Sequence, residues 1–527
     1  MNAIRLLRYG GWLVACLVLC GVGIVPLARA DNHAHWESVI ANVPDTRLPE
    51  VLVGTGGTDI FYTVRKDNMQ AVVHNRTMGK SYSEIIPGSL CVGTTCAYII
   101  RDRGQSRVVY GEQEGMPYDA ILDGSLRMEP SPRLRYFAAK EGKWFSVLQD
   151  PGGAIAIASI PFDEIRPGSC ICSANQAHTA YVGRIGAQWT ACLDGRVCPA
   201  YDALGSVVLS PDGRHIAFSA SSEGGWCCVV DGRAGRSYDG IGPIAAAPDN
   251  QHFAYPARTG EQWMLINHGP ARQAQAASGL TRVAASGVPM AEQAIGEPYA
   301  FISTPVFSPN SALIAHAVRQ DDRWSIVING RPDPWFDEVD TPVFSPANMP
   351  VYRARRGEKW TMVVGGKEGP WFDGLGTPRF AAGNTVIYPA RDGVQWRLMV
   401  NGAAGMAYDT ISDITLSPDG RHIAYTARQG EHWHVVRDGV AGRGFDQVGT
   451  PIFTMDNRHL LYAAKAGEKW AVMVDAQRGT EFPGLLRPTI YLDQINFYHF
   501  LATRPSAKSA LTGDEGTEIV LVRARAE

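Results

Sequence analysis

The chain has 527 residues, and no long charge run or low-complexity tract interrupts it. Its formal net charge at pH 7 is −3, and a slightly acidic chain offers no electrostatic basis for binding nucleic acid. We therefore do not expect this protein to bind nucleic acid.

Residues 1–30 have the features of a secretory signal peptide. Arg5 and Arg8 form a basic start, an apolar run covers 12–27, and Ala28-Arg29-Ala30 is a cleavage site. A membrane anchor is the alternative, but the apolar run is short and contains Gly and Pro. Lipidation at Cys20 is disfavoured because the preceding Leu19 is not small.

Cleavage would remove three arginines and change the formal charge to −6. No later segment is long and apolar enough to span a bilayer. We therefore expect an exported protein, periplasmic or extracellular.

Cleavage after Ala30 would also expose Asp31-Asn32-His33 at the new N-terminus. A free amine, two backbone amides and the imidazole of His33 make a square-planar site suited to Cu(II) or Ni(II). The alternative is a frayed polar terminus. No other cofactor is expected.

Nine tryptophans follow one another at intervals of 36 to 61 residues, most often 37: Trp144, Trp189, Trp226, Trp263, Trp324, Trp360, Trp396, Trp433 and Trp470. A period of this size indicates one supersecondary unit copied many times.

Residues 416–450 show what the unit contains. Ser417-Pro418-Asp419-Gly420 predicts a turn, and apolar runs follow at 422–427 and 433–436. Asp438-Gly439 favours a two-residue hairpin turn, and a last short run contains Phe445-Asp446. The unit is predicted to be a four-stranded antiparallel sheet.

The same frame occurs eleven times, because two earlier copies have Gln70 and Ser106 in place of the tryptophan. One sheet of about 37 residues cannot bury both its faces alone, but it can when packed radially against its neighbours. The sequence therefore predicts an all-β protein, a β-propeller. The tryptophans are expected to pack between blades rather than contact a ligand.

The tail supplies a twelfth copy. Three strands are expected over 489–493, 496–502 and 518–523, and the fourth strand would come from the N-terminus at 36–43, which protects the open edge. Twelve blades exceed the usual four to eight. We therefore expect two six-bladed rings, residues 31–301 and 302–527, with one large ring as the alternative. An Ala/Gly/Gln-rich insertion at about 270–297, in the sixth copy, either marks the boundary or is a long loop.

Eight cysteines remain after cleavage, an even number in an oxidising compartment. Cys91 and Cys96 flank a short turn and are expected to form a disulfide, and Cys192 and Cys198 flank Asp194-Gly195 in the same way. Cys170, Cys172, Cys227 and Cys228 would pair among themselves or across blades. A soft-metal cluster is disfavoured because the spacings of zinc sites are missing.

A cation recurs three residues after the aromatic of the second strand, and an aspartate recurs beside the aromatic of the fourth. Both fall on one face of a propeller. An internal Arg–Asp pair is the expected role, and a binding face for an anionic group is the alternative. Ser221 replaces the cation in the fifth copy. The candidates for such a face are Arg258, Arg319, Arg355, Arg391, Arg428, Asp337, Asp373, Asp409 and Asp446.

SPDGRHIAF at 210–218 and SPDGRHIAY at 417–425 resemble the TolB-type, WD-like propeller repeat of exported bacterial proteins. The resemblance covers about residues 50–525 and implies the propeller fold and a role in docking envelope proteins. Unlike TolB, this chain shows no helical periodicity before the propeller.

No hydrolase elbow, zinc-protease motif or P-loop occurs in the sequence. We expect a non-catalytic scaffold that binds an envelope protein. The alternatives are a propeller that binds a carbohydrate or another small ligand between blades and, third, an enzyme with its site at the channel.

Overall fold

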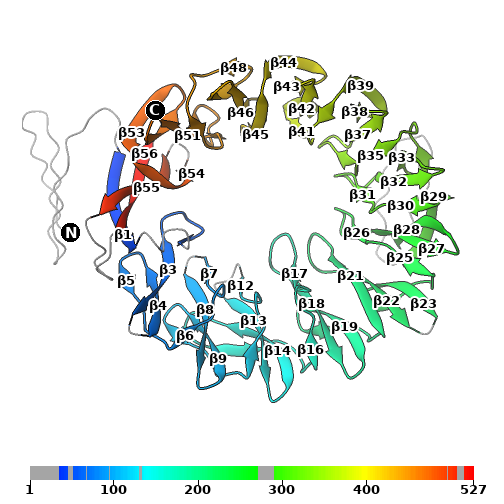
Figure 1. The fold of residues 1–527 in the computed structure, drawn as a ribbon. Coiled ribbons are helices and arrows are strands. Elements are labelled where there is room, and N and C mark those ends of the chain that lie inside the picture. The colour runs from blue at the N-terminus through cyan, green and yellow to red at the C-terminus, as the bar shows by residue number, and fades with distance from the viewer. Residues whose placement is uncertain are drawn as a thin grey trace, which may run out of the picture.

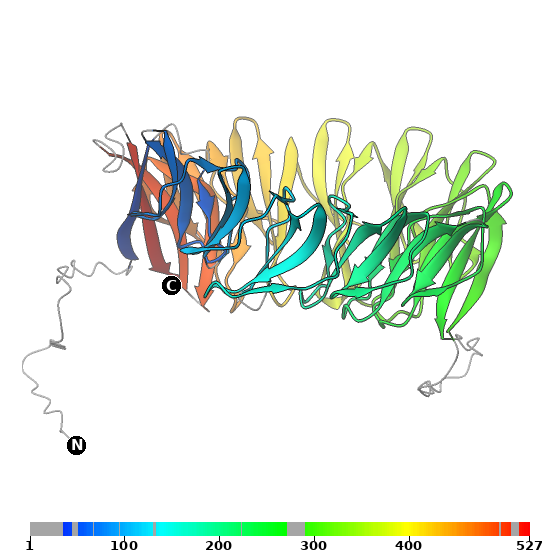
Figure 2. The ribbon, with the colours of Figure 1, turned by 90° about the horizontal axis from the view of Figure 1, so that it is seen from below.

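The fold is known from a computed structural model, which describes residues 35–44, 51–66, 68–93, 95–129, 133–222, 224–270, 290–494, 497–506 and 516–526. Strands form twelve antiparallel sheets that stand side by side as blades of one ring (Figure 1). Figure 2 shows the ring edge-on, one blade thick. Among the described residues the one helix is η2 (Ala382–Asn384), far too short to cross a membrane.

Each blade has four strand positions, which we call a to d from the axis of the ring outward. In eight blades strand a consists of two short pieces that both pair with strand b.

The strands of blades 1 to 4 are, in chain order: β2 (Leu52–Val53), β3 (Ile60–Lys66), β4 (Met69–His74) and β5 (Thr77–Met78); β6 (Glu84–Ile85), β7 (Cys91–Val92), β8 (Cys96–Asp102), β9 (Gln105–Tyr110) and β10 (Gln113–Glu114); β11 (Ala120–Ile121), β12 (Arg127–Met128), β13 (Leu134–Lys140), β14 (Lys143–Gln149) and β15 (Ile155–Ile157); β16 (Glu164–Ile165), β17 (Ile171–Cys172), β18 (Thr179–Ile185), β19 (Gln188–Leu193) and β20 (Arg196–Val197).

The strands of blades 5 to 8 are: β21 (Ala203–Leu209), β22 (Ile216–Ser222), β23 (Gly225–Val230) and β24 (Arg233–Ala234); β25 (Gly240–Ile241), β26 (Ala245–Ala246), β27 (Phe253–Thr259), β28 (Gln262–Pro270) and β29 (Met290–Tyr299); β30 (Phe301–Ile302), β31 (Val306–Phe307), β32 (Ile314–Gln320), β33 (Arg323–Ile328) and β34 (Arg331–Pro332); β35 (Glu338–Val339), β36 (Val343–Phe344), β37 (Pro350–Arg356), β38 (Lys359–Val364) and β39 (Lys367–Phe372).

The strands of blades 9 to 12 are: β40 (Gly374–Leu375), β41 (Arg379–Ala381), β42 (Thr385–Asp392), β43 (Gln395–Val400) and β44 (Ala403–Tyr408); β45 (Thr410–Leu416), β46 (Ile423–Gln429), β47 (His432–Arg437) and β48 (Val440–Ala441); β49 (Gln447–Val448), β50 (Ile452–Phe453), β51 (Leu460–Ala466), β52 (Lys469–Val474) and β53 (Gln477–Phe482); β54 (Gly484–Gln494), β55 (Phe497–Ser506), β56 (Gly516–Arg525) and, from the N-terminus, β1 (His35–Pro44).

The hydrophobic core is divided into twelve clusters, one for each contact between neighbouring blades. The cluster that joins blade 12 to blade 1 contains Ala41 of β1, Leu501 of β55 and Tyr62 of β3. Blade 12 has the order β1-β56-β55-β54, so the two ends of the chain complete one sheet. The ring is thus closed by a hydrophobic cluster of the same kind as those between its other blades.

The expectation of two six-bladed rings is wrong, and one ring of twelve blades is present. Blade 6 passes into blade 7 after a single residue, since β29 ends at Tyr299 and β30 begins at Phe301. A common core that contains Leu265 and Val318 packs these two blades together. The expected insertion is therefore no domain boundary. Its residues 290–297 belong to β29, and residues 271–289 lie outside the described part of the chain.

The two faces of the ring carry different turns. On one face, which we call the Asp-Gly face, strands c and d of five blades are joined by Asp-Gly or Asn-Gly pairs with two positive φ angles, as at Asp438 (49°) and Gly439 (81°). This is the type I′ geometry that such pairs favour. The other face carries the turns between strands b and c and the connections between blades. We call it the b–c face, and its turns include residues 321–322, 357–358, 393–394 and 430–431.

Candidate binding face and its pockets

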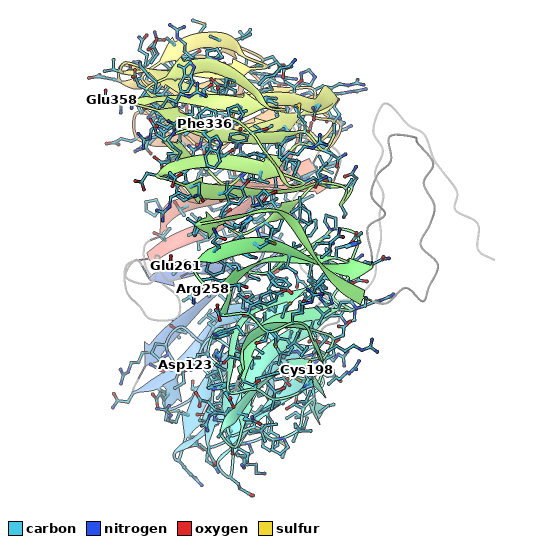
Figure 3. The ribbon with its side chains drawn as sticks, turned by 90° about the vertical axis from the view of Figure 1, so that its right-hand side faces the viewer. Asp123, Cys198, Arg258, Glu261, Phe336 and Glu358 are labelled. Carbon is cyan, nitrogen blue, oxygen red and sulfur yellow. The ribbon has the colours of Figure 1, made fainter. Side chains whose placement is uncertain are left out.

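Each repeated tryptophan is the second residue of its strand c and lies next to the turn between strands b and c. All nine are half-buried rather than buried, although five of them also pack against a core between blades. Figure 3 shows side chains of this face along one edge of the ring, with Arg258, Glu261 and Glu358 labelled. The expected packing role thus holds for these five tryptophans, while part of every indole remains at the surface.

Four of the recurring cations lie over these indoles because of strand register. The last residues of strand b pair with the first residues of strand c, which sets Arg258 opposite Trp263 and Arg355 opposite Trp360. The guanidinium carbon lies 5.8 Å from the ring centroid in the first pair and 5.9 Å in the second. Arg184 over Trp189 and Arg319 over Trp324 repeat this at 5.9 and 5.7 Å. A cation over the face of an indole is an attractive contact.

The candidate arginines differ in their further contacts within the ring. Arg355 donates to Glu338 Oε2 at 2.9 Å and to the carbonyl of Gly357 at 2.7 Å. Arg391 donates to the carbonyls of Gly393 and Asp373. Arg428 pairs with Trp433 in the ladder, and its side chain has no hydrogen bond or ion pair among the contacts of the described residues.

The expected Arg–Asp pair is not what the structure forms. Each candidate aspartate precedes strand a of the next blade, and its carboxylate accepts a hydrogen bond from a backbone N–H in that blade's b–c turn. The four bonds measure 2.6 to 2.7 Å and join Asp337 to Gly357, Asp373 to Gly393, Asp409 to Gly430 and Asp446 to Gly467. The aspartates hold turns, while three of the five candidate arginines, Arg258, Arg319 and Arg355, lie over indoles.

Two of these aspartates also pair with a cation at the start of strand c. Lys359 Nζ lies 2.6 Å from Asp373, and Arg323 lies 3.7 Å from Asp337. Lys359 and the N–H of Gly393 hold the pKa of Asp373 below its ordinary value. The partner of the aspartate is therefore a residue of strand c, which the regular spacing of strand b cations did not reveal.

A pocket of about 440 Å³ opens on this face between blades 5 and 6. Trp226 and Trp263 line it together with Arg258, Asp239 and Ser206. Gly205 also lines it, and a Cβ there would come within 2.4 Å of Ser219 Oγ. The hydroxyl of Ser206 is buried without a hydrogen-bond partner among the described residues.

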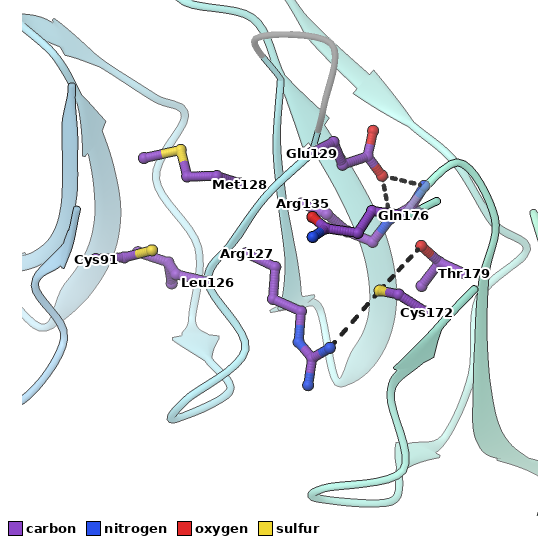
Figure 4. A pocket seen from close by; sticks show the side chains of 9 residues that line it. All are labelled: Cys91, Leu126, Arg127, Met128, Glu129, Arg135, Cys172, Gln176 and Thr179. Carbon is purple, nitrogen blue, oxygen red and sulfur yellow. Dashed lines mark hydrogen bonds and ion pairs between the residues drawn. The ribbon is translucent and has the colours of Figure 1, made fainter. Parts of the chain in front are cut away.

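A second pocket, of about 500 Å³, lies among strand a segments of blades 2, 3 and 4 (Figure 4). Arg135 is buried against Glu129 at 2.8 Å and donates to Ser146 Oγ at 2.9 Å. Arg127 donates to Cys172 Sγ at 3.6 Å. Figure 4 shows Cys91 on the side of the pocket opposite Cys172. The pocket combines a buried ion pair with an exposed thiol.

Two grooves occupy equivalent places between blades on the Asp-Gly face. One, of about 540 Å³, lies between blades 8 and 9 over Gly369 and Tyr388. The other, of about 480 Å³, lies between blades 10 and 11 over Gly442 and Tyr462.

The equivalent place between blades 5 and 6 is filled by Glu292 of β29. This carboxylate accepts hydrogen bonds from Tyr255 Oη at 2.7 Å, Tyr238 Oη at 3.3 Å and the backbone N–H of Arg236. Burial acts to raise the pKa of Glu292, but hydrogen bonds with His268 and Tyr255 outweigh it and lower that pKa. Sequence reasoning missed Glu292 because it lies in the compositionally biased insertion.

The predicted disulfides are absent, and all eight described cysteines are free thiols. The register explains the two short-range cases. Cys91 is opposite Ala97, so Cys96 points to the other side of the sheet. Cys192 is opposite Val197, which likewise sends Cys198 to the other side. Burial raises the pKa of Cys170 to about 11, despite the nearby Arg127.

No group of three or more His, Cys, Asp or Glu side chains that could hold a metal occurs within the described ranges. The predicted Cu(II) or Ni(II) site at His33 and the signal peptide both precede residue 35 and lie outside those ranges.

No family model matches this sequence, and no curated protein matches it. Among solved structures, the β-propeller domain of the Trilobed protease from Pyrococcus furiosus is 14% identical, with a TM-score of 0.28 over 53% of this chain and 97% of that one. TolB from Acinetobacter baumannii is 13% identical, with a TM-score of 0.22 over 54% and 77%. Dihydro-heme d1 dehydrogenase NirN is 14% identical, with a TM-score of 0.26 over 60% and 74%. These similarities concern the propeller fold alone.

Proposed function

We propose that this protein is an exported, non-catalytic scaffold that binds a protein of the bacterial envelope through the b–c face of its ring. The observation that carries the proposal is the composition of that face. Half-exposed tryptophans lie around it, several with an arginine over the indole. Tryptophan and arginine are the residues most enriched among the energetic centres of protein interfaces.

Rigidity supports the same function. Aspartates fix the b–c turns of successive blades, as Asp409 does at Gly430 and Asp446 at Gly467. The indoles and guanidiniums are consequently held in place before a partner arrives. A surface that is already ordered loses little conformational entropy on binding.

Two exposed valines on opposite faces provide a matched test. Val394 is 86% exposed in a b–c turn, and Val440 is 73% exposed next to an Asp-Gly turn. A photocrosslinking amino acid would replace each one separately in the protein expressed in its native envelope. We expect the variant at 394 to yield a discrete crosslinked protein that the variant at 440 does not. Crosslinking of the same protein only from position 440 would contradict the proposed face.

A second candidate function is the binding of a carbohydrate or another small ligand in pockets between blades. It is favoured by the two equivalent grooves over Tyr388 and Tyr462. Such a ligand should bind at several equivalent sites, and calorimetry would give a stoichiometry above one for each chain. A stoichiometry of one would count against this candidate.

A further inference from the structure

Trp226 differs from most of the other repeated tryptophans in its partner on strand b, which is a small residue and not a cation. Its partner across the ladder is Ser221, whereas Arg184, Arg258, Arg319 and Arg355 stand at that position in blades 4, 6, 7 and 8. In those blades the guanidinium carbon lies 5.7 to 5.9 Å from the indole centroid. Blade 5 has the indole without the arginine.

Two other positions that supply a guanidinium are also small in blade 5. In blade 4, Arg166, which directly follows β16, lies 4.6 Å from the centroid of Trp189. In blade 8, Arg353 of strand b lies 5.8 Å from that of Trp360. The equivalent of Arg166 in blade 5, three residues after the aspartate, is Gly205. The equivalent of Arg353, two residues before Ser221, is Ser219. Both line the pocket of about 440 Å³ beside Trp226.

The acceptors for a guanidinium remain at this place. Arg166 donates to the carbonyl of Leu204 in the next blade at 3.0 Å, and Arg353 donates to that of Leu375. The equivalent residue in blade 6 is Ile241, which lines the pocket with Asp239. The buried hydroxyl of Ser206, which has no partner among the described residues, is a further acceptor.

We propose that this pocket receives an arginine side chain of the partner protein, which stacks on Trp226 where other blades place their own arginine. The proposal rests on the proposed function, because it names the anchor of a partner on the b–c face. Arginine fits better than lysine because its flat guanidinium both stacks on an aromatic ring and donates in several directions. Arg258 at the pocket rim is no obstacle, since Arg355 and Arg391 are neighbours of the same kind in blades 8 and 9.

The test uses the mature protein labelled with 5-fluorotryptophan, and the probe is Nα-acetyl-arginine amide. The ¹⁹F resonance of Trp226 would be assigned from the variant Trp226→Phe. We expect the probe to shift this resonance, with affinity on the order of millimolar for one side chain. The neutral citrulline analogue should bind about tenfold more weakly or not at all, because it keeps the shape and loses the charge.

The decisive variant places an arginine of the protein itself over Trp226. Ser221→Arg restores the residue found in other blades, so the melting temperature should not fall, and the shift by the probe should be lost. Ser222→Arg is the matched control, because it adds the same charge at an exposed neighbour whose ladder partner is Gly225 and not Trp226. This control should keep the response.

Three results would overturn the inference: no shift of Trp226 with the arginine probe, an undiminished shift in folded Ser221→Arg, or a shift caused by methyl glucoside and not by arginine. None of them bears on the crosslink from position 394. If the crosslink at position 394 is missing while the arginine probe still shifts the Trp226 resonance, the proposed binding face for the protein partner is wrong and the arginine pocket stands.

Discussion

The carboxylate of Asp409 accepts a hydrogen bond of 2.7 Å from the backbone N–H of Gly430, which lies in the b–c turn of blade 10. Asp409 follows Tyr408, the last residue of β44 in blade 9. One side chain therefore joins the end of one blade to the turn of the next. The same bond recurs in neighbouring blades, at Asp373 and Asp446 among others.

Replacement of Asp409 by Ala should lower the free energy of unfolding by about 1 kcal/mol, because the N–H of Gly430 loses an acceptor. Asn retains one acceptor oxygen, so Asp409→Asn should cost less than half as much. Urea unfolding of the three proteins measures this difference. Equal stability of the Ala variant and the natural protein would show that the turn does not depend on this bond.

Arg355 and Arg428 occupy the same position in blades 8 and 10 but differ in their contacts. Arg355 lies over Trp360 and donates to Glu338, whereas none of these contacts is found for Arg428 in the described structure. Arg355→Ala should cost about 1 kcal/mol, and Arg428→Ala should change stability by less than about 0.5 kcal/mol. Denaturant titration of both variants checks the order. If partner crosslinking from position 394 weakens in Arg428→Ala, that arginine belongs to the contact surface.

His316 occupies the strand b position that tyrosine holds in blades 8, 9 and 10, and it is 1% exposed. Burial lowers its pKa to about 4 from an ordinary 6.5. Between these pH values the unfolded chain binds a proton that the folded chain does not, so the free energy of unfolding falls as the pH decreases from about 6.5 to about 4.

The variant His316→Phe isolates this effect because it keeps an aromatic ring and removes the titration. The difference in stability between the two proteins should change by on the order of 3 kcal/mol across that window and stay constant above it. Unfolding curves at pH 7, 5.5 and 4.5 provide the measurement. A difference that does not depend on pH would mean that the pKa of His316 is the same in the folded and the unfolded chain.

The repeats could be counted from the sequence, but their arrangement as one ring could not. Period, turn chemistry and the strands at both termini all depend on local sequence, and they indicated twelve copies. The number of blades in a ring depends instead on the angle between neighbours, which is set by side-chain packing at interfaces such as that between Leu265 and Val318. The insertion near the midpoint of the chain lies between strands c and d of blade 6, so it does not separate two rings.

The candidate arginines and aspartates share one face of the ring, as the strand order predicted, whereas their partners depended on register. Spacing alone could not tell that Arg355 would lie over Trp360 while Asp337 holds the turn at Gly357. The cysteines show the same limit. Cys91 and Cys96 are close in sequence, but a shift of one position in the ladder puts their side chains on opposite sides of the sheet.

The free thiols should differ strongly in reactivity. Cys172 is the exposed cysteine of the eight described, and Arg127 lies beside its sulfur. Burial raises the pKa of the other seven, that of Cys96 to about 11. Iodoacetamide at pH 8 should therefore modify Cys172 first, since the thiolate is the reacting form. Peptide mapping over time gives the order. Initial labelling of Cys228 in folded protein would show that the interface between blades 5 and 6 opens readily.

Closure of the ring should depend on β1, which pairs with β56 from Trp36 opposite Arg523 to Pro44 opposite Gly516. Ala41 and Val43 of this strand are fully buried. A chain that begins at residue 45 loses these contacts and leaves an unpaired edge on β56, which favours association between molecules. We expect a lower melting temperature and aggregation measurable by light scattering.

A peptide of residues 35–44 added in trans provides the control for this truncation, because it can pair with the same edge. It should raise the melting temperature of the shortened chain and reduce its aggregation, while a peptide with Val43→Asp should do neither, since a charge would enter the core between blades 12 and 1. A shortened chain that melts at the temperature of the mature protein and stays monodisperse would mean that blade 12 is stable with three strands.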